Sequence, residues 1–340
     1  MTIRVLVADD SATVRNALIA LLAKDPRLTI VGQAADGLEA VAKARNLRPD
    51  VITMDVDMPH LDGLGATAAI MADAPARVLV VCGVSEEKQL DLSFRAMAAG
   101  ALELIAKPAG GGDLRAWGEK VAQAIVLMAE VPVVRRQRPS SSPPMAPLGS
   151  ASQQVDVVAL VASTGGPPAL AQVLGALPAD LCVPILIAQH IAEGFGAGLL
   201  RWFSGVTKLR VIAASEGMSA AAGTVYLPPD GRDLEIDAAG ILHVPRPTGL
   251  HCPSGNRLLH SLARSFGHRA GAVVLTGMGD DGAQGLLAMR QSGGATFVQD
   301  EATSVVFGMP QAALALGAAR TELSLESVAA AILELCRRRS

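Results

Sequence analysis

The chain has 340 residues, of which 50% are hydrophobic and 18% charged, and its net charge of −3 gives no general attraction to nucleic acid or to an anionic membrane. Aromatic residues make up only 3% of it, too few for a surface on which single-stranded bases stack. The length predicts two domains, each with its own core. The N-terminus has no signal-peptide pattern, no uncharged apolar run reaches the ~18 residues of a membrane span, and the four cysteines lack paired spacing. We therefore expect a cytoplasmic protein without direct membrane insertion.

The first part of the chain, residues 1–128, alternates short apolar runs with helical patterns. The apolar runs predict five strands, at residues 3–8, 29–31, 51–54, 78–82 and 104–106. Apolar residues at helical spacing lie between them, and a last helix is expected at about 114–130. Alternation of this kind predicts a doubly wound α/β domain built on a five-stranded parallel sheet.

Acidic residues and one lysine stand where these strands end. Asp9 and Asp10 follow the first strand, Asp55 follows the third, and Lys107 follows the fifth. The carboxyl ends of parallel strands line the ligand crevice of an open sheet, so these side chains are expected to converge. Three carboxylates together are unfavourable unless a hard cation such as Mg²⁺ neutralises them. The alternative is that these acids are solvated loop residues. That interpretation fits a single carboxylate better than three carboxylates and a lysine, all at strand ends.

This spacing resembles that of two-component receiver domains over about residues 1–128, and so do Met58-Pro59, Asp62-Gly63 and Pro108. The resemblance implies that Asp55 accepts a phosphoryl group from a histidine kinase and that Lys107 contacts the phosphoryl oxygens. It also implies that Asp9, Asp10 and the backbone carbonyl of Asp57 bind Mg²⁺.

Two positions depart from the receiver pattern. Cys82 stands where receivers usually have serine or threonine, and Leu104 stands where they often have an aromatic residue. The usual hydroxyl bonds the phosphoryl group, whereas a thiol is a weak donor. We therefore expect phosphorylation to occur but to activate the protein weakly.

Residues 129–154 are predicted to be a linker, because proline and serine are dense there and cannot pack a core. After it, residues 155–340 return to an alternating pattern. Strands are expected at 155–162, 183–188 and 272–275, and helices at 168–177, 256–266 and 283–291. Two short runs separated by a glycine turn predict a hairpin over 235–244. The second domain is thus expected to be a larger parallel-sheet α/β domain with an inserted hairpin.

Ser163 lies in the segment Val161-Ala162-Ser163-Thr164-Gly165-Gly166-Pro167, between a predicted strand and a predicted helix. A serine on such a turn is exposed beside the amide groups of a helix N-terminus, as in hydrolases that use a serine nucleophile. The alternative is a helix cap or a phosphate-binding turn.

A hydrolytic serine needs a base and a group that orients it. His190 ends the strand at 183–188, on the edge where Ser163 is expected, and the other five histidines have no comparable placement. Asp280 and Asp281 follow the strand at 272–275, and spacing alone does not choose between them. The chain order Ser, His, Asp differs from the Ser, Asp, His order of α/β-hydrolases, so we expect a convergent triad on another sheet.

These motifs together resemble the catalytic domain of protein-glutamate methylesterases over about residues 155–320. Further stretches typical of that family are Ala188-Gln189-His190, Tyr226-Leu227-Pro228-Pro229, Pro253-Ser254, Gln299-Asp300-Glu301-Ala302-Thr303-Ser304 and Gly308-Met309-Pro310. The resemblance implies that Ser163 is the nucleophile, His190 the general base and Asp281 the orienting carboxylate. It further implies backbone N–H donors to the oxyanion at Met278 and Thr164.

The implied activity is a phosphorylation-regulated serine hydrolase of a two-component system. It would remove methyl esters from glutamates of methyl-accepting chemoreceptors, in chemotaxis adaptation or a related pathway, and would also deamidate glutamines. No cofactor is implied for the esterase reaction, and a chemotaxis histidine kinase is the implied phosphodonor. In this family the unphosphorylated receiver restrains the hydrolase.

Two other classes of function fit the sequence less well. A DNA-binding response regulator is disfavoured, because no basic helix-turn-helix is evident and Lys208 is the only lysine after the linker. A non-catalytic, phosphorylation-dependent binding module is disfavoured by the complete set of serine, histidine and aspartate.

Overall fold

The computed structural model describes residues 2–83, 87–108, 112–129, 154–249 and 251–336. The chain divides into two units, Met1–Arg138 and Pro139–Ser340. Their boundary falls inside the linker predicted for 129–154, of which residues 130–153 lie outside the described part, so the linker stays a prediction. Within the described ranges, no helix has the length and hydrophobicity needed to cross a membrane.

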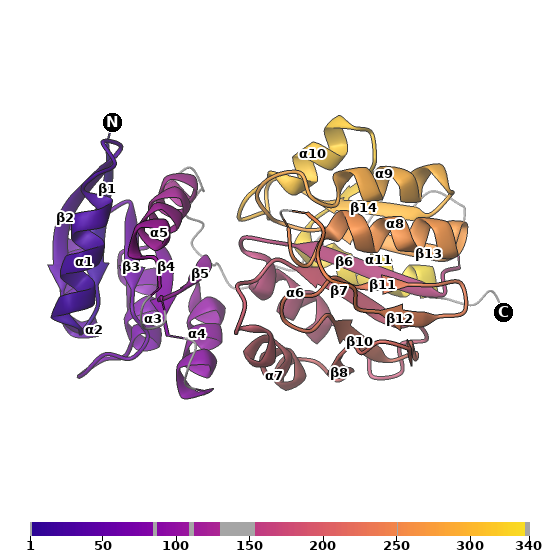
Figure 1. The fold of residues 1–340 in the computed structure, drawn as a ribbon, viewed down its shortest axis with the longest axis horizontal. Coiled ribbons are helices and arrows are strands. Elements are labelled where there is room, and N and C mark those ends of the chain that lie inside the picture. Colours follow the sequence, from indigo (N-terminus) through magenta and orange to yellow (C-terminus); the bar gives the residue numbers. More distant parts are fainter. Residues whose placement is uncertain (1, 84–86, 109–111, 130–153, 250, 337–340) are drawn as a thin grey trace. The chain divides into compact units, whose positions relative to one another are not determined.

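The first unit contains a parallel sheet with the strand order β2-β1-β3-β4-β5 (Figure 1). Its strands are β1 (Ile3–Ala8), β2 (Leu28–Ala34), β3 (Val51–Met54), β4 (Arg77–Cys82) and β5 (Glu103–Ala106). All five were expected, because nearly continuous apolar runs are typical of strands buried on both faces. The predicted doubly wound α/β fold is confirmed.

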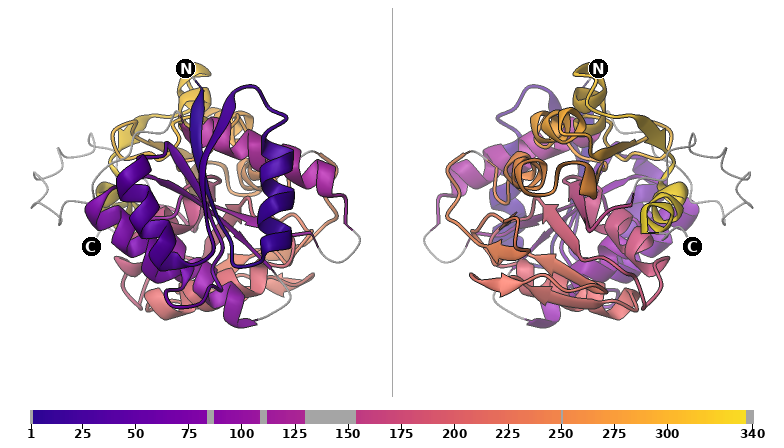
Figure 2. Two further views of the ribbon diagram at one scale, coloured as in Figure 1. Left: turned by 90° about the vertical axis from the view of Figure 1, so that its left-hand side faces the viewer. Right: turned by 90° about the vertical axis from the view of Figure 1, so that its right-hand side faces the viewer.

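Helices cover both faces of this sheet (Figure 2). On one face, α1 (Ala12–Leu22) packs beside α5 (Leu114–Ala129), and on the other α2 (Gly37–Leu47), α3 (Gly63–Asp73) and α4 (Glu87–Ala99) pack in sequence. The strand order reverses between β1 and β3, and in such sheets the ligand crevice lies at this reversal. The residues after β1 and β3 are therefore those that meet there.

The second unit contains a seven-stranded parallel sheet in the order β15-β14-β13-β6-β7-β10-β8. Its strands are β6 (Val157–Ala162), β7 (Ile185–Gln189), β8 (Arg210–Ala213), β10 (Thr224–Leu227), β13 (Ala270–Val274), β14 (Ala295–Gln299) and β15 (Thr321–Leu323). The central strands β13, β6 and β7 are fully buried, and they are the three that the sequence predicts. Ser163 follows β6 and His190 follows β7, on neighbouring strands.

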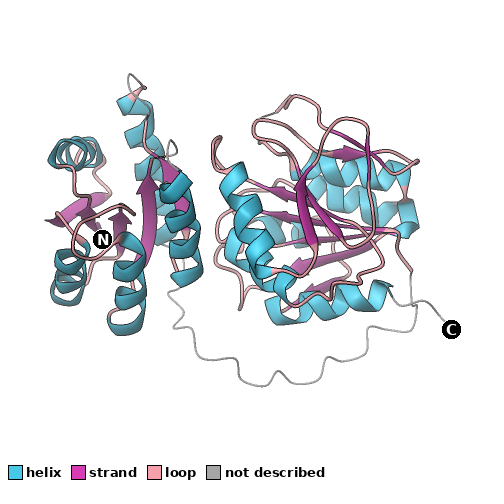
Figure 3. Ribbon diagram, turned by 90° about the horizontal axis from the view of Figure 1, so that it is seen from below, coloured by secondary structure: helices cyan, strands magenta, loops and turns pink. Residues whose placement is uncertain are grey.

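Helices also lie on both sides of this larger sheet (Figure 3). One layer contains α6 (Gly166–Gly175), α7 (Gly196–Val206) and α11 (Leu325–Cys336), and the other contains α8 (Gly255–Ser265), α9 (Ala283–Gln291) and α10 (Met309–Ala315). The predicted hairpin is present as β11 (Glu235–Ile236) and β12 (Ile241–His243), which are antiparallel. A third short strand, β9 (Met218–Ser219), extends it, and α8 packs on β11.

Candidate active site

The turn that carries Ser163 is held tightly between β6 and α6. The Ser163 N–H donates to the carbonyl of Thr276 at 3.0 Å, and the Ser163 carbonyl accepts from the Gly166 N–H at 2.8 Å. Gly165 has φ +73, a left-handed conformation that favours glycine, and a Cβ there would lie 2.5 Å from Val305. Gly277 also approaches closely, since a Cβ on it would be 2.8 Å from the Cβ of Ser163. The Ser163 turn and the segment after β13 therefore pack closely and restrict each other's position.

His190 meets one of the two candidate carboxylates. Its ring Nε2 lies 2.8 Å from Oδ2 of Asp281, whose side chain is fully buried. Asp280, the other candidate, is exposed and makes no such contact. The structure thus brings Asp281 and not Asp280 to the imidazole. The ring nitrogen left for Ser163 is Nδ1.

Asp281 is bonded to the N-terminus of α8. Its carboxylate accepts from the backbone N–H groups of Gly255 at 2.6 Å and Asn256 at 2.9 Å, and from the hydroxyl of Ser254 at 3.2 Å. Burial alone raises the pKa of Asp281, but the bonds from His190, Asn256 and Gly255 outweigh it and lower the pKa to about 2. The carboxylate is therefore ionised at neutral pH, as a group that stabilises an imidazolium must be.

A second histidine, His251, stacks on the candidate base. The two rings are nearly parallel, at 7°, and their centroids are 5.0 Å apart. The sequence position of His251 does not indicate this contact, because His190 and His251 lie on segments far apart in the chain. Only the path of the loop before α8 brings the rings together.

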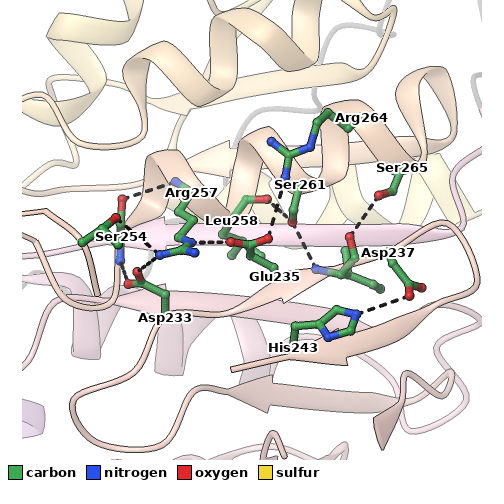
Figure 4. A network of polar contacts seen from close by, with 12 residues as sticks. Asp233, Glu235, Asp237, His243, Ser254, Arg257, Leu258, Ser261, Arg264 and Ser265 are labelled. Carbon is green, nitrogen blue, oxygen red and sulfur yellow. Dashed lines mark hydrogen bonds and ion pairs between the residues drawn. The ribbon is translucent and has the colours of Figure 1, made fainter. Parts of the chain in front are cut away.

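A polar network holds that loop against α8 (Figure 4). Arg257 pairs with Asp233 at 3.2 Å and with Glu235, and it also bonds the carbonyl of Arg246. The buried carboxylate of Asp233 accepts in turn from the Ser254 N–H at 2.8 Å. Arg257 therefore supports the segment that binds Asp281. The position of Arg257 in the sequence does not indicate this role, because its partners lie in and next to the inserted sheet.

The backbone N–H groups of Met278 and Thr164, which are the predicted oxyanion donors, are available to bind an oxyanion. Among the described residues, neither backbone N–H donates a hydrogen bond, and the Met278 side chain is 38% exposed. No hydrogen bond joins the Ser163 hydroxyl to the His190 ring within those residues. Such bonds are often long before substrate binds and shorten in the complex.

A cavity of about 410 Å³ lies near this site, and its wall includes Gln189 and Ile191, the two neighbours of His190 in the chain, but neither His190 nor Ser163. Its remaining wall is largely apolar and includes Leu199, Leu227 and Pro228. Concave, largely apolar spaces of this size are typical of ligand sites.

The acidic residues of the first unit also converge. Carboxylate oxygens of Asp9, Asp10 and Asp55 lie within 4.8 Å of one another, and Lys107 Nζ is 2.8 Å from both Asp9 and Asp55. Burial raises the pKa of Asp55 to about 6, although the charge of Lys107 opposes this. Oxygen ligands with surplus negative charge fit Mg²⁺. The side chain of Asp57 is exposed and outside this cluster, and the role of its backbone carbonyl stays a prediction.

Cys82, the unusual residue of the receiver pattern, is fully buried at the end of β4. The Ser93 hydroxyl of α4 donates to its sulfur at 2.9 Å. Burial raises the pKa of Cys82 to about 11, so this residue is a neutral thiol.

Comparisons with known proteins agree with both halves of this description. A family model described as CheB methylesterase matches residues 158–332, and one described as response regulator receiver domain matches residues 5–117. A Myxococcus xanthus protein named protein-glutamate methylesterase/protein-glutamine glutaminase 3 is 55% identical over 98% of this chain and 94% of its own length. A Nitrosospira multiformis protein of the same name, without the number, is 41% identical over 98% and 97%.

A solved structure is similar as well. The crystal structure of the Thermotoga maritima CheB methylesterase catalytic domain is 29% identical, with a TM-score of 0.52 over 54% of this chain and 99% of that one. Sequence motifs, sheet topology and relatives therefore agree. The chain belongs to the CheB methylesterase family and carries a response regulator receiver domain at its N-terminal end.

Proposed function

We propose that this protein hydrolyses γ-glutamyl methyl esters of methyl-accepting chemoreceptors and deamidates receptor glutamines, under control of phosphorylation at Asp55. The observation that carries the proposal is the bond from His190 to the buried Asp281, one strand away from the Ser163 turn. The names of the relatives, which describe a methylesterase and glutaminase, support the substrate class.

In the proposed reaction the Ser163 hydroxyl attacks the ester carbonyl while His190 Nδ1 takes its proton. Asp281 keeps the other ring proton on Nε2 and stabilises the imidazolium. The N–H groups of Met278 and Thr164 face the developing oxyanion, and each such donor typically contributes ~3 kcal/mol. When the intermediate collapses, His190 returns the proton to the leaving methoxide and methanol departs.

The second half of the reaction frees the enzyme. Water attacks the acyl-Ser163 ester, His190 removes its proton, and the glutamate carboxylate leaves as Ser163 regains a proton. For a glutamine side chain the same steps release ammonia in place of methanol. These steps use only side chains and amides of the second unit.

Regulation is proposed to begin in the receiver. A histidine kinase would supply the phosphoryl group to Asp55, and Lys107 would contact its oxygens. Asp9, Asp10 and the backbone carbonyl of Asp57 would hold Mg²⁺, which when bound supplies positive charge beside the phosphoryl oxygens. The convergence of three carboxylates with Lys107 supports this assignment.

Methanol release tests the proposal directly. The full-length protein is incubated with membranes that contain methyl-labelled chemoreceptors from a candidate pathway, and volatile label is counted. Ser163→Ala should release none, yet keep its thermal unfolding midpoint and its phosphorylation at Asp55. Wild-type turnover in Ser163→Ala would reject the nucleophile, and a folded wild type without release would contradict the substrate class.

A further inference from the structure

Gln189, the last residue of β7, bonds the main chain of both the proposed nucleophile and the proposed base. Its side chain is only 3% exposed. The amide nitrogen Nε2 donates to the Ser163 carbonyl at 2.9 Å and to the His190 carbonyl at 2.7 Å. One side-chain group therefore connects the turn after β6 with the residue after β7.

This connection begins where the regular sheet ends. β6 and β7 pair in parallel as far as Ala162 and Gln189, and the last ladder bond runs from the His190 N–H to the Ala162 carbonyl at 3.0 Å. Among the described residues, no backbone hydrogen bond joins Ser163 to His190. The Gln189 amide supplies a link one residue beyond the ladder.

The orientation of that amide is fixed by its surroundings. Reversing it would place Oε1 against two carbonyl oxygens, which offer no proton. As it stands, Oε1 is buried and lacks a hydrogen-bond partner in the described residues, which is unfavourable for folding. A Cβ on Gly166 would lie 2.1 Å from Oε1, so only glycine leaves room for the amide there.

We propose that Gln189 is a positioning residue that sets the distance and angle between Ser163 and His190. Its amide nitrogen bonds neither the Ser163 hydroxyl nor the His190 ring, and it acts through the two carbonyls that it binds. The inference rests on the proposed function, because it assigns Ser163 and His190 as nucleophile and base. Loss of the amide should let the segments that carry Ser163 and His190 move apart.

Gln189→Met tests this, since methionine has similar length and volume but no N–H group. In the full-length protein we expect kcat for methanol release to fall by about ten- to hundred-fold with KM nearly unchanged, because displacing a catalytic group by ~1 Å can have effects of this size. The matched control is Ser261→Ala, which removes a buried side chain that also bonds two backbone groups, those of Ile236 and Leu258. The control should lose stability while kcat stays at the wild-type value.

A proton resonance gives a second readout that does not need a substrate. The His190 Nε2–H bonded to Asp281 should give a low-field signal, which Gln189→Met should shift or broaden and Ser261→Ala should leave in place. Failure of the wild type to release methanol would count against the proposed function only, because the resonance still reports on Gln189.

Three results decide the matter. A folded Gln189→Met with wild-type kcat and an unchanged resonance would overturn the inference, and so would a kcat loss no larger than that of Ser261→Ala. If Gln189→Met does not fold, Gln189→Leu replaces it, because leucine is smaller and also lacks the N–H group. The same loss of kcat and the same resonance change are then expected, and their absence rejects the role.

Discussion

Asp281 accepts hydrogen bonds from His190 and from three consecutive residues at the start of α8, whereas its neighbour Asp280 is exposed. Asp281→Asn should lower kcat on the order of 10⁴-fold, because the amide no longer holds the required imidazole tautomer. Asp280→Asn should change kcat little. Methanol release by the two variants checks this, and the opposite ranking would show that the wrong carboxylate has been assigned.

Cys82 gives a prediction for the response to phosphorylation. A hydrogen bond to a charged acceptor contributes ~1.5–3 kcal/mol, of which a thiol recovers little, and ~1.4 kcal/mol changes a population ten-fold. Cys82→Thr should therefore raise the gain in esterase rate on phosphorylation by about ten-fold, if a hydroxyl at this position drives the switch.

Cys82→Val is the control for that experiment, because valine matches threonine in shape and lacks the hydroxyl. Esterase rates are measured for wild type and both variants with and without a phosphoryl donor. An equal gain in all three proteins would show that Ser93, which already bonds the sulfur, or another group makes the hydroxyl unnecessary.

At the scale of elements, the N-terminus of α8 stabilises the anionic form of Asp281. Helix N-terminal amides attract negative charge, and here two of them and the Ser254 cap reach one carboxylate. The pKa of Asp281 is thereby lowered to about 2 in the folded protein, below the ~3.9 expected for an unfolded chain. A lowered pKa contributes stability above pH ~4, and this contribution is lost as pH falls from about 4 to 2.

Chemical denaturation at a series of pH values checks this sign. The free energy of unfolding of wild type should exceed that of Asp281→Asn by an amount on the order of 2 kcal/mol at neutral pH, and the excess should shrink below pH ~4. Asp280→Asn is the control, since its exposed side chain should give no such trend. A difference that grows as the pH falls would contradict the role given to α8.

For the whole molecule, each unit has a complete sheet and a separate core of buried residues. A fragment of residues 151–340 should therefore fold and melt cooperatively on its own. The family resemblance implies that the unphosphorylated receiver restrains the hydrolase, so the fragment should release methanol faster than the unphosphorylated full-length protein. Equal or lower rates in a well-folded fragment would argue against that restraint.

The fold class and the type of chemistry could be predicted from the amino-acid sequence alone. Long apolar runs predicted the five receiver strands and the buried central strands β6, β7 and β13, because strands covered on both faces need no polar alternation. The other four strands of the larger sheet were missed. Of these, β8 is only partly buried and β15 has three residues, so their local patterns are weak.

The residues that support the proposed triad could not be predicted in this way, because they depend on tertiary contacts. Spacing did not choose between the adjacent Asp280 and Asp281; the family resemblance implied Asp281, and the turn after β13 points Asp281 at α8 and His190. Gln189, His251 and Arg257 contact segments that are distant in the chain. Local sequence sets strand and helix preference, whereas such contacts exist only after the sheet has brought the strand ends together.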